Sequence, residues 1–414
     1  MNQKIFIHAS EIVTPIGRGP VCQEQMKNLK IILDGAIVVE DGVIRKVGTT
    51  QEILQEFNGP YELVDLGKKA VIPGFVDSHT HFVFGGYRPE EFIMRLQGKS
   101  YMDIMNAGGG IAASVKMTRE ASETELYTSG LIRLMEMLAM GVTTVEGKSG
   151  YGLDLPTELR QLKVMKQLQA TQPVDIVCTY LGAHAVPAEY KERADQYITF
   201  MLEKVLPQIR SLELAEFCDV FCEEGVFSTE QSRKLLTEAK RMGFQLKMHA
   251  DEIISLGGAE LAAELGAVSA DHLLAVSEQG ISKLSEQGVV ATLLPCTAFS
   301  LNKAYAPARK LIDRGVAVAL ATDFNPGSCF TSSIPLVIAL ACIHMGMSIE
   351  ETITALTLNG AAALGRAESI GSIETGKRAD FVVLKYPSYQ FLVYHTAMNI
   401  VEKVVKSGEI VYGN

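Results

Sequence analysis

Eight short apolar runs recur along the middle of the chain, each long enough for a strand. They lie at residues 71–81, 141–150, 174–185, 217–227, 244–252, 267–273, 288–295 and 316–325. Runs that are apolar on both faces, rather than alternating, are typical of parallel strands covered on both sides. The middle of the chain is therefore predicted to form a parallel sheet.

Helix-like amphipathic segments separate most of these runs, for example ETELYTSGLIRLMEMLAMG and STEQSRKLLTEAKRMG. Several follow a Ser or Thr, have an acidic first turn and end in Gly, which are the usual signals for helix starts and ends. Eight repeats of strand and helix fit a closed (β/α)8 barrel of the TIM type better than an open doubly wound sheet, which is the alternative. The predicted fold class is α/β.

Both ends of the chain have a different, strand-only pattern. Near the N-terminus, Asp34-Gly35 and Asp41-Gly42 separate β-branched runs and predict hairpin turns. Near the C-terminus, RADFVVLKYP and VEKVVKSGEIVYG are also strand-like. We expect residues 1–70 and 366–414 to form one small composite β-sandwich domain, and residues 71–365 to form the barrel.

The composition is that of a globular chain, with 47% hydrophobic and 21% charged residues among 414. The net charge of −10 argues against nucleic-acid or anionic-membrane binding, but a local cation could still bind an acidic small substrate. We find no signal peptide and no membrane-spanning run. The seven scattered cysteines indicate reduced thiols in a cytoplasmic protein. Cys218 and Cys222 are interpreted as core residues rather than as a metal pair.

Metal-capable side chains cluster where the apolar runs end. In a (β/α)8 barrel the carboxyl ends of all strands meet on one face, which holds the active site. His79 and His81 stand two apart on the first run, so both imidazoles point to the same side. With His249 on the fifth run and Asp323 on the eighth, they form a ligand set that suits Zn²⁺ or Fe²⁺ and leaves room for a water. We predict that these four residues hold one divalent ion.

A hydrolytic reaction also needs groups that handle protons. A bound divalent ion lowers the pKa of its water from about 15.7 toward 7, and a base must still take the proton. Either Glu252 or Asp323 is placed to do so, and His272 is placed to hold the polarised oxygen or the hydroxide. The alternatives are a solvated loop carboxylate for Glu252 and a packing role for His272.

Candidate substrate contacts lie in the loops after the runs. Arg88 follows two glycines in FVFGGYRPEE, and its planar guanidinium is suited to clamp a substrate carboxylate. A surface salt bridge is the alternative for Arg88. The other candidate contacts are Tyr151, His184, Asn325, Gly327 and Ser328.

The motif VIPGFVDSHTH, followed by His on the fifth and sixth runs and Asp on the eighth, resembles the amidohydrolase superfamily. The tail GSIETGKRADFVVL is similar to the return of that superfamily into its β domain. The joined motifs HFVFGGYRPEEF, VKSGYGL, LGAHAVP, HADEI, SADHL and ATDFNPGS resemble one branch of it, whose members open an imidazolone ring. The resemblance runs from about residue 30 to the end of the chain.

This resemblance implies a homodimeric enzyme with one zinc or iron ion, hydrolysing 4-imidazolone-5-propanoate to N-formimidoyl-L-glutamate. The propionate of that substrate would call for a cation such as Arg88. The residues that the resemblance implies are His79, His81, His249 and Asp323 for the metal, Arg88, Tyr151, His184 and Glu252 for the substrate, Asn325, Gly327 and Ser328 for the product, and Glu252 and His272 for proton handling.

The chain departs from related patterns at two places. Binuclear members use a carboxylated Lys on the fourth strand, and the fourth run here has none, which favours one ion. Glu223 and Glu224 on that run leave a second, weak ion open. Cys296 stands in LLPCTAF where Gly is expected, which makes the shape of that loop uncertain.

Two other functions stay open. One is an aminohydrolase of a nucleobase-like ring with the same metal set, against which Arg88 argues, because a neutral base has no carboxylate. The other is a non-catalytic binding protein on the same scaffold, against which the presence of Glu252, His272 and Asp323 argues.

Overall fold

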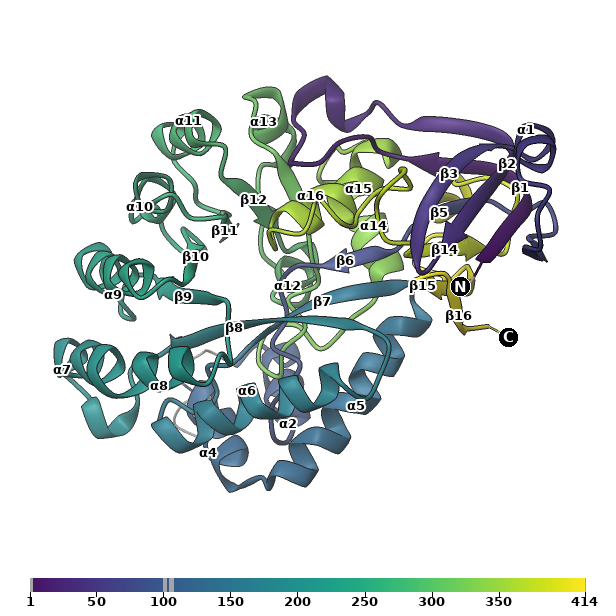
Figure 1. Ribbon diagram of the computed structural model, residues 1–414. Coiled ribbons are helices and arrows are strands. Elements are labelled where there is room, and N and C mark those ends of the chain that lie inside the picture. Colours follow the sequence, from purple (N-terminus) through teal and green to yellow (C-terminus); the bar gives the residue numbers. More distant parts are fainter. Residues whose placement is uncertain (1–2, 100–102, 104–107, 414) are drawn as a thin grey trace.

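The computed structural model describes residues 3–99, 103 and 108–413. The remaining positions of the two predicted domains lie outside this part. The described chain forms two eight-stranded sheets. Figure 1 shows one of them, β6 to β13, with helices around it, and the other beside it with both termini.

The eight predicted runs of the middle region each contribute a barrel strand. These strands are β6 (Phe75–Asp77), β7 (Val142–Lys148), β8 (Asp175–Ala183), β9 (Phe217–Cys222), β10 (Gln245–Ala250), β11 (Ser269–His272), β12 (Val290–Leu293) and β13 (Val318–Leu320). Each pairs in parallel with its neighbours in chain order. The predicted parallel sheet is confirmed.

The two ends of this sheet meet, which excludes the open-sheet alternative. Thr80 and Phe324, just beyond β6 and β13, form a parallel bridge. The N–H of His81 donates to the carbonyl of Phe324 at 2.9 Å, and the N–H of Asp323 donates to the carbonyl of His79 at 3.0 Å. The sheet is therefore a nearly closed (β/α)8 barrel, as predicted.

Helices connect the strands and cover the outside of the barrel (Figure 1). The longer ones are α2 (Pro89–Leu96), α4 (Ile111–Glu120), α5 (Glu123–Ala139), α6 (Leu155–Gln169), α9 (Thr229–Arg241), α10 (Gly258–Leu265), α11 (Glu278–Gln287), α14 (Ile334–His344) and α15 (Ile349–Leu356). The shorter ones are α1 (Thr50–Glu56), α7 (Ala194–Phe200), α8 (Leu206–Ser211), α12 (Pro295–Ser300), α13 (Ala308–Asp313), α16 (Leu358–Ala362) and α17 (Phe391–Tyr394). The predicted caps are present: Ser122 and Ser228 form capping boxes, and Gly266 and Gly288 end helices in the left-handed conformation.

Strands from both ends of the chain form the second sheet. They are β1 (Gln3–Thr14), β2 (Lys30–Glu40), β3 (Val43–Thr49), β4 (Glu62–Asp65), β5 (Val71–Pro73), β14 (Phe381–Leu384), β15 (Val401–Lys406) and β16 (Glu409–Tyr412). β5 pairs with β1 and β14, so the first predicted run, 71–81, is divided between the two sheets at Gly74. The composite β part from both termini is confirmed as one separate sheet, and the domain bounds 1–70, 71–365 and 366–414 stay a prediction.

One of the two predicted hairpin turns is wrong. At Asp41-Gly42 both residues have positive φ (48° and 81°), and β2 and β3 pair on either side as expected. At Asp34-Gly35, however, β2 continues without a turn. Asp34 has φ 45° there, but Leu33 and Gly35 on either side pair in one register with Glu11 and Ala9 of β1, and the register shift lies beyond them, between Phe6 and Ala9.

No helix in the described ranges is long and apolar enough to cross a membrane. The largest hydrophobic core lies within the barrel and between its strands and helices, and smaller cores cover the faces of the terminal sheet. Cys218 and Cys222 belong to the largest core and are free thiols, in agreement with their interpretation as core residues.

Candidate active site

The four predicted metal ligands converge at the carboxyl ends of the barrel strands. His79 and His81 follow β6, His249 lies in β10 and Asp323 follows β13, and all four are at most 2% exposed. The Nε2 atoms of His79 and His81 lie 3.6 and 3.5 Å from Oδ1 of Asp323. The His249 ring is centred 4.5 Å from that of His79. The fold thus brings together side chains that are far apart in the sequence.

Candidate ligand groups overlap at this point. His79, His81 and Asp323 have ligand atoms within 4.8 Å of one another. Two further triads share members with it, namely His79, His249 and His272, and His81, His184 and His249. His184 and His272 are therefore additional candidate ligands, although sequence reasoning assigned them to substrate and proton handling.

The imidazole nitrogens of this cluster fit a cation. Nε2 of His79, Nδ1 of His81 and both ring nitrogens of His249 and His272 are buried and have no hydrogen-bond partner in the described part of the chain. Buried polar atoms without partners are rare, and an ion among these rings would give one nitrogen of each ligand histidine a partner. Burial lowers the pKa of His79 below its usual range, as does the Lys148 ammonium, and it lowers the pKa of His81 to about 3. The rings are therefore neutral at pH 7 and have lone pairs for a metal ion.

Asp323 and His272 have backbone conformations that side chains other than Gly rarely adopt. Their φ angles are 56° and 77°, in the left-handed region. Such strain persists only where the surroundings impose it, and it is frequent at functional sites. Thr297 in α12 helps to hold Asp323, because its hydroxyl donates to Oδ2 at 2.6 Å. Sequence reasoning noticed the segment LLPCTAF for Cys296, which is buried in the same helix, and missed Thr297.

Glu252 and His272, the predicted proton-handling pair, are neighbours. Oε2 of Glu252 lies 3.6 Å from Nδ1 of His272, and the glutamate side chain is 18% exposed. Burial raises the pKa of Glu252 to about 8, and the carboxylates of Asp323 and Glu223 act in the same direction. Burial also raises the pKa of Asp323. A carboxyl group with a pKa near neutrality can exchange protons at physiological pH.

Tyr151 and His184 line the same side of the cluster. The His184 ring stacks on that of His81 with centroids 5.0 Å apart, and its Nδ1 lies 3.1 Å from the carbonyl of Gly150. A carbonyl only accepts, so Nδ1 carries the proton and Nε2 is left as an acceptor. Burial raises the pKa of Tyr151, as does Asp323, whereas Arg88 lowers it. Tyr151 therefore lies close enough to Asp323 in the imidazole cluster and to Arg88, the predicted carboxylate-binding residue, to interact electrostatically with both.

Arg88 lies at the start of α2 with its side chain 9% exposed. Its Nη1 lies 2.8 Å from Oε2 of Glu91, so the ion pair considered as its alternative role is present, although it is not on the surface. A Cβ added at Gly327 would lie 2.3 Å from Nη2 of Arg88, which shows how closely the guanidinium packs on the loop after β13. Arg95 lies in the same helix, seven residues after Arg88, and the sequence analysis did not select it. Its buried Nη1 has no hydrogen-bond partner in the described ranges. The i, i+7 spacing from Arg88 was the available signal.

The loop after β13 is shaped by its own asparagine. Oδ1 of Asn325 accepts the N–H groups of Gly327 and Ser328, both at 2.8 Å, and Nδ2 donates to the carbonyl of Asp323. The amide of Asn325 is thus used within the loop. Contacts of Asn325, Gly327 and Ser328 with a product stay a prediction.

Glu223, considered above as part of a second ion site, has another role. It is 1% exposed, and its two oxygens accept the N–H groups of Glu224 and Ile253 at 2.9 and 2.8 Å. Glu224 is exposed. Within the described chain, neither belongs to a group of residues whose spacing suits an ion.

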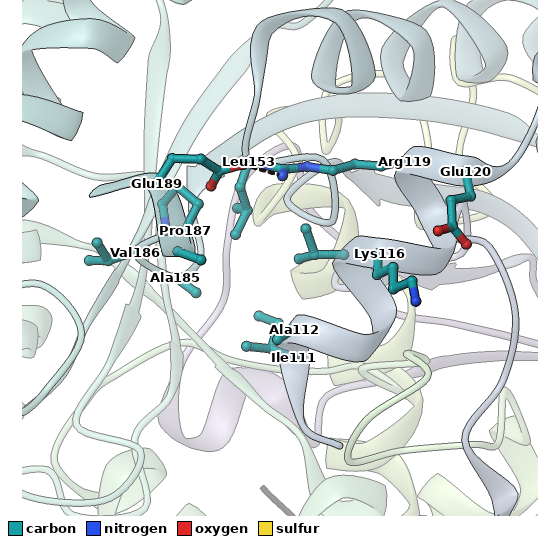
Figure 2. Close-up of a pocket in the computed structure, with 12 residues that line it drawn as sticks. Ile111, Ala112, Lys116, Arg119, Glu120, Leu153, Ala185, Val186, Pro187 and Glu189 are labelled. Carbon is teal, nitrogen blue, oxygen red and sulfur yellow. Dashed lines mark hydrogen bonds and ion pairs between the residues drawn. The ribbon is translucent and has the colours of Figure 1, made fainter. Parts of the chain in front are cut away.

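A cavity of about 310 Å³ lies beside the site, between α4 and the loop after β8 (Figure 2). Its lining includes Leu153 and Ala185, which are close in sequence to Tyr151 and His184, but none of the predicted metal ligands. Arg119 closes one side through an ion pair with Glu189. Because none of the predicted metal ligands lines it, we interpret the cavity as a neighbour of the site rather than as the place of the chemistry.

Imidazoles and a carboxylate at the carboxyl ends of (β/α)8 strands define a hydrolase of the amidohydrolase type. Residues 70–411 match the amidohydrolase family. Imidazolonepropionase of Clostridium tetani is 59% identical over 409 residues, covering 99% of this chain and 98% of that protein. Imidazolonepropionase of Parabacteroides distasonis is 59% identical over 411 residues, covering 99% of each. The chain therefore belongs to the amidohydrolase family and, within it, to the imidazolonepropionases.

Solved structures with lower identity share the fold. An adenosine deaminase from Xanthomonas campestris with bound zinc has a TM-score of 0.71 at 21% identity, covering 98% of this chain and 92% of that one. Guanine deaminase of E. coli has a TM-score of 0.70 at 16% identity and covers 100% of both chains. At these identities the likeness supports the architecture and does not assign a substrate.

The purified protein is expected to contain about one zinc or iron ion per chain by elemental analysis. His249→Ala and Asp323→Ala should each lose most of it, because each removes one of few ligands. Cys218→Ala is the matched control and should keep the ion, since Cys218 belongs to the hydrophobic core. Two ions per chain, or full metal content in both ligand variants, would contradict the assignment.

Proposed function

We propose that this chain hydrolyses 4-imidazolone-5-propanoate to N-formimidoyl-L-glutamate in histidine degradation. The observation that carries the proposal is that the guanidinium of Arg88 packs on Gly327, in the loop that follows Asp323 of the imidazole cluster. A substrate that spans these groups needs an electrophilic ring at one end and a carboxylate at the other. The imidazolone ring and its propionate provide both, and the similarity to imidazolonepropionases agrees with this assignment.

We propose that His79, His81, His249 and Asp323 hold one divalent ion, zinc or iron. The carboxylate of Asp323 supports this set over the triads of histidines alone, because its Oδ1 lies 3.6 and 3.5 Å from Nε2 of His79 and His81. His184 fits a substrate contact better, because it is only partly buried, whereas the four proposed ligands are at most 2% exposed. When bound, the ion supplies a Lewis acid that polarises the ring carbonyl and lowers the pKa of water.

The side chains of the chain then bind the substrate and move protons. Arg88 holds the propionate, and Tyr151 and His184 contact the ring. Glu252 takes a proton from the attacking water at a carboxylate oxygen and delivers it to the ring nitrogen as the bond between this nitrogen and the carbonyl carbon breaks. Glu252 is favoured over Asp323 as the base, because Asp323 is held by Thr297 on one oxygen and faces His79 and His81 with the other. His272, beside Glu252, steadies the developing charge.

Further expectations accompany this proposal. The choice between zinc and iron, the homodimer and the cytoplasmic location stay predictions. We expect neither nucleic acid nor membrane as a partner, because of the net charge of −10.

The metal-loaded protein is expected to accelerate the loss of the ultraviolet absorbance of enzymatically generated imidazolone propionate, with formation of the ring-opened product. Cytosine and guanine serve as control substrates. Ammonia release from either, without turnover of the imidazolone, would favour the aminohydrolase alternative. Metal binding without any turnover would favour the non-catalytic one.

Arg88→Ala is expected to raise KM by about 10- to 100-fold with a smaller change in kcat. The reason is that a charge-assisted bond to the substrate carboxylate contributes roughly 1.5–3 kcal/mol to binding. Steady-state kinetics measure this split. Arg241→Ala removes an exposed arginine on α9 and should change neither constant. An unchanged KM for Arg88→Ala would remove this residue from the clamp.

Glu252→Gln is expected to reduce kcat by about 10²- to 10⁴-fold. In the parent enzyme kcat/KM should rise with pH, because the raised pKa of Glu252 leaves the carboxyl protonated, and inactive as a base, at lower pH. A bound cation lowers this pKa, so the midpoint should lie no higher than about 8. Glu224→Gln, an exposed neighbour, should keep both rate and profile. An acid limb that persists in Glu252→Gln would assign it to another group.

A further inference from the structure

Five charged side chains are buried inside the barrel next to the imidazole cluster, each with 0% exposure. They are Glu146 and Lys148 on β7, Asp219 on β9, Lys247 on β10 and Asp271 on β11, and we refer to them as the buried charge cluster. Lys247 precedes His249 by two residues on the same strand, so it faces the same side one step deeper in the barrel. The interior at this level is therefore ionic, where small barrels usually contain aliphatic layers.

The cluster is held together by two ammonium groups. Nζ of Lys148 lies 2.9 Å from Glu146 and 2.7 Å from Asp219, and Nζ of Lys247 lies 2.7 Å from Glu146. Both lie farther from Asp271, at 3.6 and 3.7 Å. With two ammonium groups facing it, Asp271 is placed to act as a hydrogen-bond acceptor.

Asp271 connects this cluster to a metal ligand. Its Oδ2 lies 2.6 Å from Nδ1 of His79, and its Oδ1 accepts the hydroxyl of Ser269 at 2.6 Å. Because this carboxylate accepts from Ser269 and faces two ammonium groups, it also accepts from Nδ1 of His79, which then carries the proton. The Nε2 lone pair of His79 is then free, and Nε2 is the atom that lies 3.6 Å from Asp323.

The other two proposed ligand imidazoles, His81 and His249, have no equivalent bond in the described chain. Nδ1 of His81 is unpaired in the described chain. Asp219 accepts the main-chain N–H of His249 at 3.2 Å, and its other oxygen lies 3.0 Å from Nδ1 without the alignment of a hydrogen bond. His79 is thus the ligand whose tautomer is set by the protein.

The spacing of His79, Glu146 and Asp271 would itself suit a metal ion. However, the two ammonium groups already lie within 3.0 Å of Glu146 and neutralise much of its charge and that of Asp271. A divalent ion at this point would face two positive charges in a region without water. The ammonium groups of Lys148 and Lys247 therefore supply the positive charge that a second metal ion would otherwise bring to this point.

We propose that Asp271 is a positioning residue, which holds His79 in the tautomer and orientation that bind the ion, and that Lys148 and Lys247 hold Asp271. The inference rests on the metal centre of the proposed function. Carboxylates that orient a ligand histidine typically contribute 10- to 100-fold to metal affinity.

The first test measures zinc affinity of the metal-free protein by competition with a chromophoric chelator. Asp271→Ala should bind zinc about 10- to 100-fold more weakly, and Asp271→Asn less so, because an amide oxygen can still accept from Nδ1. Lys148→Met should act in the same direction. Asp380→Ala is the matched control: Asp380 is 5% exposed and paired with Lys406 and Arg378 in the terminal sheet. It should lower Tm and leave zinc affinity unchanged.

Unchanged zinc affinity in Asp271→Ala would overturn the inference and leave the proposed function intact. A parent protein that binds no metal and hydrolyses no imidazolone would overturn the proposed function instead. Should Asp271→Ala fail to fold, ¹⁵N-histidine NMR of the metal-free parent gives an independent answer. The His79 signal, assigned by its loss in His79→Gln, should show the proton on Nδ1. A proton on Nε2 would contradict the inference.

Discussion

Two main-chain hydrogen bonds join the last barrel strand to the first, one from the N–H of Asp323 to the carbonyl of His79 and one from the N–H of His81 to the carbonyl of Phe324. With the bridge between Thr80 and Phe324, they bring the ends of the sheet together. The carboxylate after β13 is thereby placed beside the two imidazoles after β6. Because the closed sheet also excludes water from its interior, every polar group inside needs a partner or an ion.

The chemistry of the site follows from this exclusion of water. Burial keeps the imidazoles of His79, His81 and His249 neutral, so that they offer lone pairs, and it raises the pKa of Glu252 to about 8. The same exclusion would make isolated buried charges very costly. The barrel interior compensates by placing two lysines among three carboxylates. Such a cluster adds little net stability, but it is rigid, and it contacts both His79 and His249.

The mouth of the barrel combines strain and close packing. Asp323 and His272 have left-handed backbone conformations at the strand ends, and Gly327 leaves room for Arg88. The loop conformations thus bring Asp323 and His272 to the imidazole cluster and allow Arg88 to pack on the loop after β13. A carboxylate-binding group and an imidazole cluster near one tyrosine define a small acidic ring compound better than either group could alone.

The amino-acid sequence determined the strands, the helix caps and the same-sided placement of His79 and His81, because these depend on local periodicity and on capping chemistry. It also pointed to Arg88 and Glu252, since both follow apolar runs. It did not show that β2 continues through Asp34-Gly35, because Asp-Gly is frequent in turns and only the pairing with β1 on both sides of these residues shows an unbroken strand. Nor did it show that residues 71–81 are shared between two sheets.

Only the tertiary structure decided which side chains face one another. Glu146, Lys148, Asp219, Lys247 and Asp271 come from four strands, and the alternation within each strand tells which side a residue faces but not what lies opposite. The same holds for Thr297 beside Asp323 and for Arg95 near Arg88. Their partners depend on strand order and on barrel closure, which are properties of the whole chain. The ligand set could therefore be predicted residue by residue, whereas the charges that support it became visible only in the folded barrel.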